Sequence, residues 1–141
     1  GRPCAAQLLI YPATDLITER PSQSLFGDGF FMTTADASAF LRYYTGNRAD
    51  MLQDPRAAPM RADDLGGLPP ALVVTAGFDI LRDEGEAYAA ALRASLTPAE
   101  SLRFPSLVHG FLHMTALSPG ARDAVETIAR KWRALLDTVA R

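Results

Sequence analysis

Blocks of apolar and polar positions along the chain predict alternating strands and helices. Residues 7–11 and 71–76 form short, continuously apolar runs, and such runs are typical of strands covered on both faces in a parallel sheet. A third strand is expected at residues 100–104, where polar residues at 101 and 103 indicate one exposed face. Long helical patterns separate and follow these strands. The order favours an α/β fold with a mainly parallel sheet.

The expected helices have recognisable starts and apolar stripes. They are predicted at about residues 34–45, 83–95 and 119–139. Thr34 is expected to cap the first, Asp83 and Glu86 stand at capping-box spacing for the second, and Ser118-Pro119 opens the third. Residues 13–31 are rich in Gly, Ser and Pro, and they are expected to form a loop.

Composition narrows the class of protein. The 141 residues are 48% hydrophobic and carry 14 basic against 16 acidic side chains, a net charge of −2. These values fit one ordinary globular domain over residues 1–141, without internal repeats, and they exclude a disordered chain. No apolar run is long enough to span a bilayer, and no basic cluster marks a nucleic-acid partner. The single cysteine, Cys4, forms no disulfide within the chain, which favours the cytoplasm over an oxidising compartment.

Two chemically useful side chains follow the second and third predicted strands. Asp79 comes just after the strand at 71–76, and His109 follows the strand that ends near Pro105. Because the carboxyl ends of parallel strands share one edge of a sheet, both residues are expected there. A carboxylate that orients an imidazole creates a general base for a nucleophile. On spacing alone, Asp79 as a turn former and His109 as a surface residue remain open.

Metal binding is the weaker interpretation of the histidines. His109 and His113 are four residues apart, but Gly110 weakens a helix between them and no third ligand is close in sequence. The acidic pairs Asp63-Asp64 and Asp83-Glu84 fit a loop and the start of a helix. We therefore expect neither a metal nor an organic cofactor.

Several motifs, in order, resemble the hormone-sensitive-lipase-like carboxylesterases, which are α/β hydrolases also called bacterial family IV esterases. The similarity runs from about Gln7 to the end of the last helix. The motifs that carry it are Leu9-Ile10-Tyr11-Pro12-Ala13-Thr14-Asp15, Asp54-Pro55-Arg56, Leu68-Pro69-Pro70-Ala71-Leu72-Val73, Gly77-Phe78-Asp79-Ile80-Leu81-Arg82-Asp83-Glu84-Gly85, Tyr88-Ala89 and His109-Gly110-Phe111.

The resemblance implies that Asp79 is the acid and His109 the base of a Ser-His-Asp triad. No serine of the chain lies in a G-x-S-x-G motif, and the family's His-Gly-Gly oxyanion motif is absent. In the family both precede the strand that corresponds to Leu8–Tyr11. The chain is therefore expected to be the C-terminal part of one α/β-hydrolase domain, cut at Gly1. Its expected partners are a small-molecule carboxylic ester and the N-terminal half, against which Leu8–Tyr11 would pair.

Substrate contacts and alternative functions stay open at this stage. Phe31 and Ile80 are expected to line an acyl pocket, although core packing explains them equally well. The sequence departs from the family at Ala94-Ser95-Leu96, where Ala-Gly is usual, and at Ser106, where Gly is common. The alternatives to an esterase are a fragment that only binds or dimerises, as a homodimer, and another α/β hydrolase such as a serine peptidase.

Overall fold

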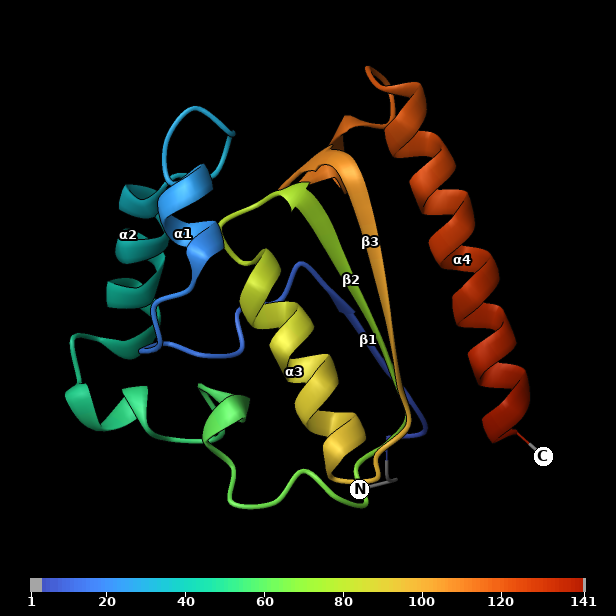
Figure 1. Ribbon diagram of the computed structural model, residues 1–141, viewed down its shortest axis with the longest axis horizontal. Coiled ribbons are helices and arrows are strands. Elements are labelled where there is room, and N and C mark those ends of the chain that lie inside the picture. Colours follow the sequence, from blue (N-terminus) through green and yellow to red (C-terminus); the bar gives the residue numbers. More distant parts are fainter. Residues whose placement is uncertain (1–3, 141) are drawn as a thin grey trace.

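A three-stranded parallel sheet forms the centre of the molecule. In the computed structural model, which describes residues 4–140, the strands lie in the order β1-β2-β3 (Figure 1). The cut expected at Gly1 lies outside these residues. The strands are β1 (Gln7–Ile10), β2 (Ala71–Phe78) and β3 (Ala99–Val108), and the helices are α1 (Pro21–Phe26), α2 (Thr34–Thr45), α3 (Arg82–Ala94) and α4 (Pro119–Val139). The α/β architecture predicted from the sequence is confirmed.

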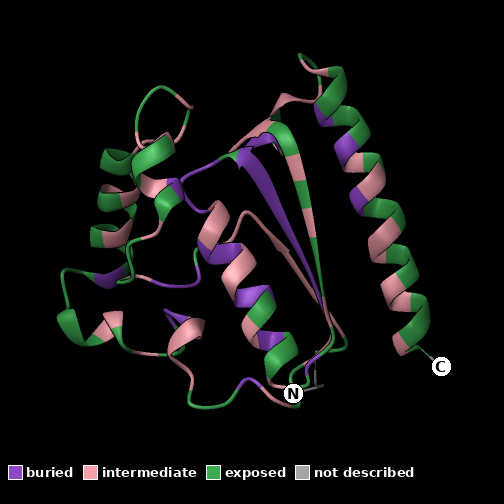
Figure 2. Cartoon of the chain, in the orientation of Figure 1, coloured by how far each residue is buried: buried purple, intermediate pink, exposed green. Residues whose placement is uncertain are grey.

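The middle strand, β2, is buried on both faces (Figure 2). Leu72, Val74 and Ala76 pack on the α4 side of the sheet, with Ile128 of that helix and with Phe111, which precedes it. The alternate residues of β2 pack on the other face, together with Ala89 and Leu92 of α3. Because both faces of β2 are buried, its successive residues are mostly apolar and do not alternate with polar ones.

Three expectations about local structure are wrong. Residues 21–26, expected within a loop, form the short helix α1, which begins at a proline. Thr33, rather than Thr34, caps α2, and it exchanges hydrogen bonds with Asp36. Helix α3 begins at Arg82 without a side-chain cap, because the Asp83 carboxylate instead accepts a hydrogen bond from the backbone N–H of Ser22, 2.8 Å away.

The third strand runs further than expected. It continues through Pro105 to Val108, so residues 106–108 belong to the strand and not to a loop. A proline is tolerated there because β3 lies at an edge of the sheet and its pairing with β2 is irregular at that point. His109 therefore follows directly on a strand.

The irregularity between β2 and β3 is centred on Gly77. The register shifts between Ala76 and Phe78, and the backbone of Pro105 lies against Gly77. A Cβ atom on residue 77 would be 2.0 Å from the Pro105 carbonyl oxygen. Only glycine fits this close approach of two main chains.

Substituting Gly77 by alanine is expected to destabilise the protein by about 3 kcal/mol, because the clash is with backbone and no flexible side chain can yield. Denaturant unfolding followed by circular dichroism measures the change. Gly120→Ala is the matched control, since the nearest side-chain atom would be 3.7 Å from its Cβ. A Gly77→Ala protein as stable as the Gly120→Ala protein would contradict the expectation.

Helix α3 ends in a Schellman motif with an unusual residue. The N–H of Thr97 donates to the carbonyl of Leu92, and the N–H of Leu96 donates to that of Arg93. Leu96 holds the left-handed position, at φ 62°, and its side chain is 91% exposed. Leucine holds this left-handed position at a conformational cost that glycine would not have.

We expect Leu96→Gly to raise the stability of the protein by about 1 kcal/mol, because the change relieves the left-handed strain and removes almost no packing. Thermal unfolding measures it as a higher midpoint. Leu117→Gly serves as the control, since Leu117 is 88% exposed and does not have a positive φ. A midpoint that falls for Leu96→Gly would refute the strain argument.

Strand β1 has one strand neighbour within residues 4–140, namely β2. Leu8 and Ile10 pack toward α4, and Leu9 packs toward α3, so the strand has apolar residues on both faces. The expected pairing of its other edge with a segment outside the chain remains a prediction. Over the same described range, no helix combines the length and the apolar character needed to cross a membrane.

Candidate active site

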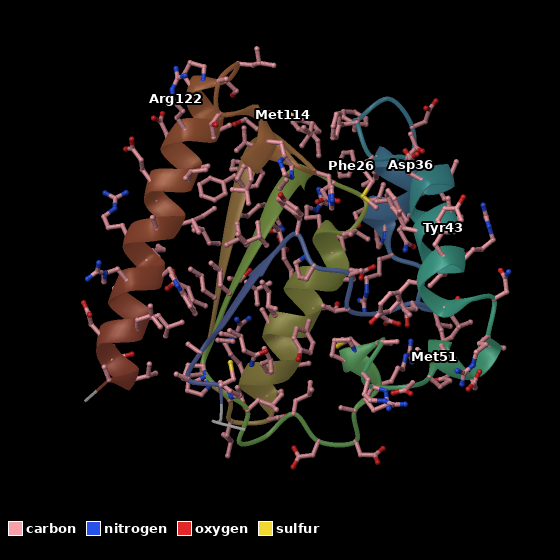
Figure 3. All side chains as sticks on the ribbon, turned by 180° about the vertical axis from the view of Figure 1, so that it is seen from behind. Phe26, Asp36, Tyr43, Met51, Met114 and Arg122 are labelled. Carbon is pink, nitrogen blue, oxygen red and sulfur yellow. The ribbon has the colours of Figure 1, made fainter. Side chains whose placement is uncertain are left out.

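Asp79 and His109 lie at the carboxyl edge of the sheet, as their positions after β2 and β3 predicted. From the contact between Gly77 and Pro105, β2 and β3 both run on to this edge. Figure 3 shows Phe26 of α1 and Met114, which precedes α4, on this same side of the molecule. The edge is therefore bordered by α1 on one side and by the start of α4 on the other.

A hydrogen bond joins the two residues. Nδ1 of His109 is 2.9 Å from Oδ2 of Asp79, and Oδ1 of Asp79 accepts from the backbone N–H of Leu81 at 2.8 Å. The Asp79 side chain is fully buried, whereas that of His109 is 20% exposed. Because an ionised carboxylate only accepts hydrogen bonds, Nδ1 donates to it, and in a neutral imidazole Nε2 then carries the lone pair. An imidazole held in this way can accept a proton from a third group.

Two aromatic side chains border His109. The ring of Tyr11, directly after β1, has its centroid 4.4 Å from the imidazole centroid. Phe31 lies next to Gly110, where a Cβ atom would be 3.2 Å from its Cε1 atom. Phe31 is 68% exposed, so this predicted substrate contact lies beside the base and on the surface.

Ile80, the other predicted substrate contact, lies elsewhere. It is 2% exposed and lines an open hollow of about 1020 Å³ between α1, α2 and residues 13–20. Neither Asp79, His109 nor Phe31 lines this hollow. The structure therefore does not bring Phe31 and Ile80 together in one pocket.

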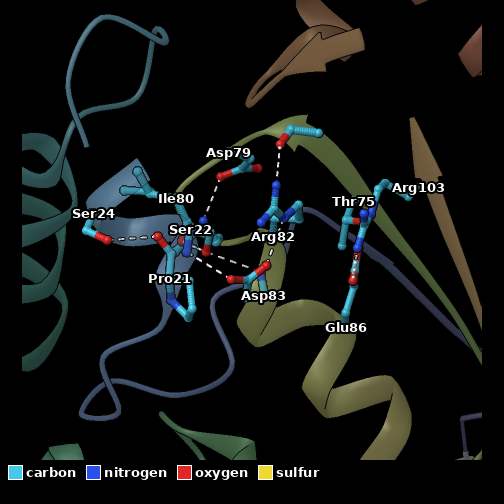
Figure 4. Close-up of polar contacts among 12 residues, drawn as sticks. Pro21, Ser22, Ser24, Thr75, Asp79, Ile80, Arg82, Asp83, Glu86 and Arg103 are labelled. Atoms are coloured by element: carbon cyan, nitrogen blue, oxygen red, sulfur yellow. Dashed lines mark hydrogen bonds and ion pairs between the residues drawn. The ribbon is translucent and has the colours of Figure 1, made fainter. Parts of the chain in front are cut away.

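A polar contact ties α1 to the turn that carries Asp79 (Figure 4). The Ser22 hydroxyl, which is buried, donates to the carbonyl of Ile80 at 2.8 Å, and the N–H of Ser22 donates to Asp83. Burial opposes ionisation of Asp83, but hydrogen bonds from Arg82 and Ser22 outweigh it and lower its pKa. Arg82 also donates to the carbonyl of Gly77. No sequence pattern indicated this contact, because Ser22 and Asp83 are far apart along the chain.

A second buried contact holds the segment after β1. Glu84 accepts hydrogen bonds from the backbone N–H groups of Thr14 and Asp15, at 2.6 and 3.2 Å. Burial raises the pKa of Glu84 to about 7, against the effect of these two donors. Burial acts on Asp15 as well, but hydrogen bonds from Thr18 and Arg61 prevail and lower its pKa to about 2. This cluster fixes residues 14–15 against α3.

The described residues offer no metal site. Over residues 4–140, no group of three or more His, Cys, Asp or Glu side chains is arranged to hold an ion. His113, the second histidine of the sequence, is exposed. In the same part of the chain no serine hydroxyl is hydrogen-bonded to the ring of His109.

A parallel sheet with an acid and a base at its carboxyl edge is an arrangement found in α/β hydrolases. Residues 1–113 match the model of the alpha/beta hydrolase fold family. The chain belongs to this family, and within it to the hormone-sensitive-lipase-like carboxylesterases, as the sequence motifs indicated.

Curated relatives of the chain are named as ester hydrolases. The carboxylic ester hydrolase LipN of Mycobacterium tuberculosis is 42% identical over 133 residues, which are 94% of this chain and 35% of that protein. The esterase LipI of the same organism is 37% identical, over 88% of this chain and 39% of its own length. The chain thus spans somewhat more than a third of these relatives.

Solved structures agree with the fold. An ester hydrolase from the metagenome of Lake Arreo, complexed with a derivative of bipyridine phosphonate, superposes with a TM-score of 0.82 and 38% identity. The match covers 97% of this chain and 42% of that one. A thermostable esterase from Pseudomonas putida also gives a TM-score of 0.82, with 40% identity, over 88% of this chain and 40% of its own.

Proposed function

We propose that this chain supplies Asp79 and His109 to a Ser-His-Asp triad that hydrolyses carboxylic esters. The serine and the oxyanion hole would come from a segment outside the 141 residues. The observation that carries the proposal is the 2.9 Å hydrogen bond between a fully buried carboxylate and a partly exposed imidazole. The names of the relatives, which are ester hydrolases, support the substrate class.

The geometry supports a definite order of events. Nε2 of His109 takes the proton of the serine hydroxyl as the serine oxygen attacks the ester carbonyl. His109 then gives this proton to the leaving alcohol, and an acyl-enzyme remains. Water, deprotonated by the same nitrogen, attacks the acyl carbonyl; the bond to the serine oxygen then breaks, His109 returns the proton to that oxygen, and the acid leaves. Asp79 stabilises the imidazolium that forms in each half of the cycle.

A fluorophosphonate probe tests where the nucleophile lies. We expect the probe to label the full-length hydrolase on a serine outside these residues, and to leave the isolated 141-residue chain unlabelled. Peptide mapping by mass spectrometry locates the label. A phosphonylated serine among Ser22, Ser24, Ser38, Ser95, Ser101, Ser106 or Ser118 would refute the proposed division of the triad.

Substrate assays separate the ester hydrolase from its alternatives. The full-length protein is expected to hydrolyse p-nitrophenyl esters of short and medium chain length and to leave chromogenic peptides intact. Faster turnover of peptides would favour a serine peptidase. A full-length protein that neither turns over esters nor reacts with the probe would favour binding or dimerisation as the function.

A further inference from the structure

Tyr11 has an unusual backbone conformation for its residue type. Its φ is 39°, in the left-handed region that bulky side chains seldom adopt, although the following Pro12 favours an extended conformation at residue 11. The N–H of Tyr11 donates to the carbonyl of Val74 at 2.7 Å, so this backbone is held by the sheet. A strained residue that its surroundings hold in place beside an active site raises the question of what its side chain does there.

The side chain of Tyr11 lies against the base. Its ring centroid is 4.4 Å from that of His109, with 52° between the planes, and its other neighbour, Phe111, meets it edge-on at 5.6 Å. The hydrogen bond to Asp79 fixes one nitrogen of the imidazole, but rotation about the bond between Cβ and the ring has broad energy minima. A second contact, on the ring itself, restricts this rotation further.

We propose that Tyr11 is a positioning residue for His109, whose ring holds the imidazole in the plane that directs Nε2 at the nucleophile. This inference rests on the proposed function, because positioning matters only if His109 is the base. The ring of Tyr11 is tilted against the imidazole of His109 and meets Phe111 edge-on. Burial and the nearby charge of Asp79 both raise the pKa of Tyr11, so its hydroxyl stays neutral next to the catalytic acid.

Kinetics of substituted full-length hydrolases test the proposal. Tyr11→Leu removes the ring and is expected to lower kcat for p-nitrophenyl butyrate about 100-fold, with KM little changed, because a small misalignment of a base has this effect. Tyr11→Phe keeps the ring and should restore kcat to within about threefold of the original. If Tyr11→Leu does not fold, Tyr11→Asn replaces it, since asparagine tolerates a positive φ.

Phe104→Leu is a matched structural control. Phe104 is half-buried like Tyr11 and also lies 5.6 Å from Phe111, at an angle of 63°. Its loss should lower thermal stability much as the loss of Tyr11 does and leave kcat unchanged. An equal fall of kcat in Phe104→Leu and Tyr11→Leu would reduce Tyr11 to a packing role and overturn the proposal.

Proton NMR supplies a readout that packing alone does not move. The Nδ1–H proton of His109, assigned by its absence in His109→Ala, should be sharp in the original protein, in Tyr11→Phe and in Phe104→Leu, and broadened by solvent exchange in Tyr11→Leu. Full activity of His109→Ala would refute the proposed function itself. If His109→Ala is inactive while Tyr11→Leu keeps both kcat and the sharp resonance, the inference about Tyr11 alone is wrong.

Discussion

Replacing His109 by alanine is expected to lower kcat for ester hydrolysis by about 10⁶-fold, the loss seen when the base of a serine triad is removed. Without the imidazole, the serine hydroxyl keeps its proton and the leaving alcohol receives none. Binding of the ester does not involve Nε2, so KM should change little. Steady-state hydrolysis of p-nitrophenyl butyrate by the full-length enzyme measures both constants.

His113→Ala is the control for this substitution. His113 is the other histidine of the chain, it is exposed, and it lies four residues further along. We expect its loss to leave kcat unchanged. If His113→Ala abolished turnover and His109→Ala did not, the base would be misassigned.

Asp79→Asn is expected to lower kcat by about 10⁴-fold. The amide keeps the size of the side chain but carries no charge, so it neither stabilises the imidazolium nor enforces the tautomer with a proton on Nδ1. The bond from the N–H of Leu81 to Oδ1 can persist on the amide oxygen, which limits the structural effect. The pH dependence of kcat/KM and the thermal midpoint, measured together, separate the catalytic loss from unfolding.

Asp83→Asn distinguishes the two acids of this segment. The Asp83 carboxylate accepts hydrogen bonds from the N–H of Ser22 and the side chain of Arg82, whereas His109 is hydrogen-bonded to Asp79. Its substitution should lower stability modestly, by about 1 kcal/mol, and reduce kcat less than tenfold. A larger loss of kcat in Asp83→Asn than in Asp79→Asn would reverse the assignment of the acid.

The order of strands and helices could be predicted from the sequence because each long element carries its own periodic pattern. The three strands and the helices α3 and α4 have apolar runs or stripes that face the core, whereas Phe40 and Tyr44 on the apolar stripe of α2 are exposed. Helix α1 has only six residues, too few to show a period, and it is held by Ser22 against a distant segment. Asp83 failed as a predicted cap for the same reason, since its partner lies 61 residues away.

The acid and base could be predicted because topology alone brings them to one edge. What surrounds them could not be predicted in the same way. The approach of Tyr11 to His109 depends on a positive φ that no sequence pattern indicates before a proline. Ile80 follows Asp79 directly, yet it lines the hollow beside α1 and α2, whereas Phe31, with φ 75°, lies against Gly110 next to His109.

The contact of Gly77 with Pro105 has a consequence for how this enzyme family can diverge. Asp79 follows Gly77 by two residues, and His109 follows Pro105 by four. The distance between acid and base is thus set by a contact between two main chains, and not by the packing of α3 and α4. Core residues of the helices can therefore be substituted, and the helices can shift by a fraction of an ångström, while Asp79 and His109 stay within hydrogen-bond distance of each other.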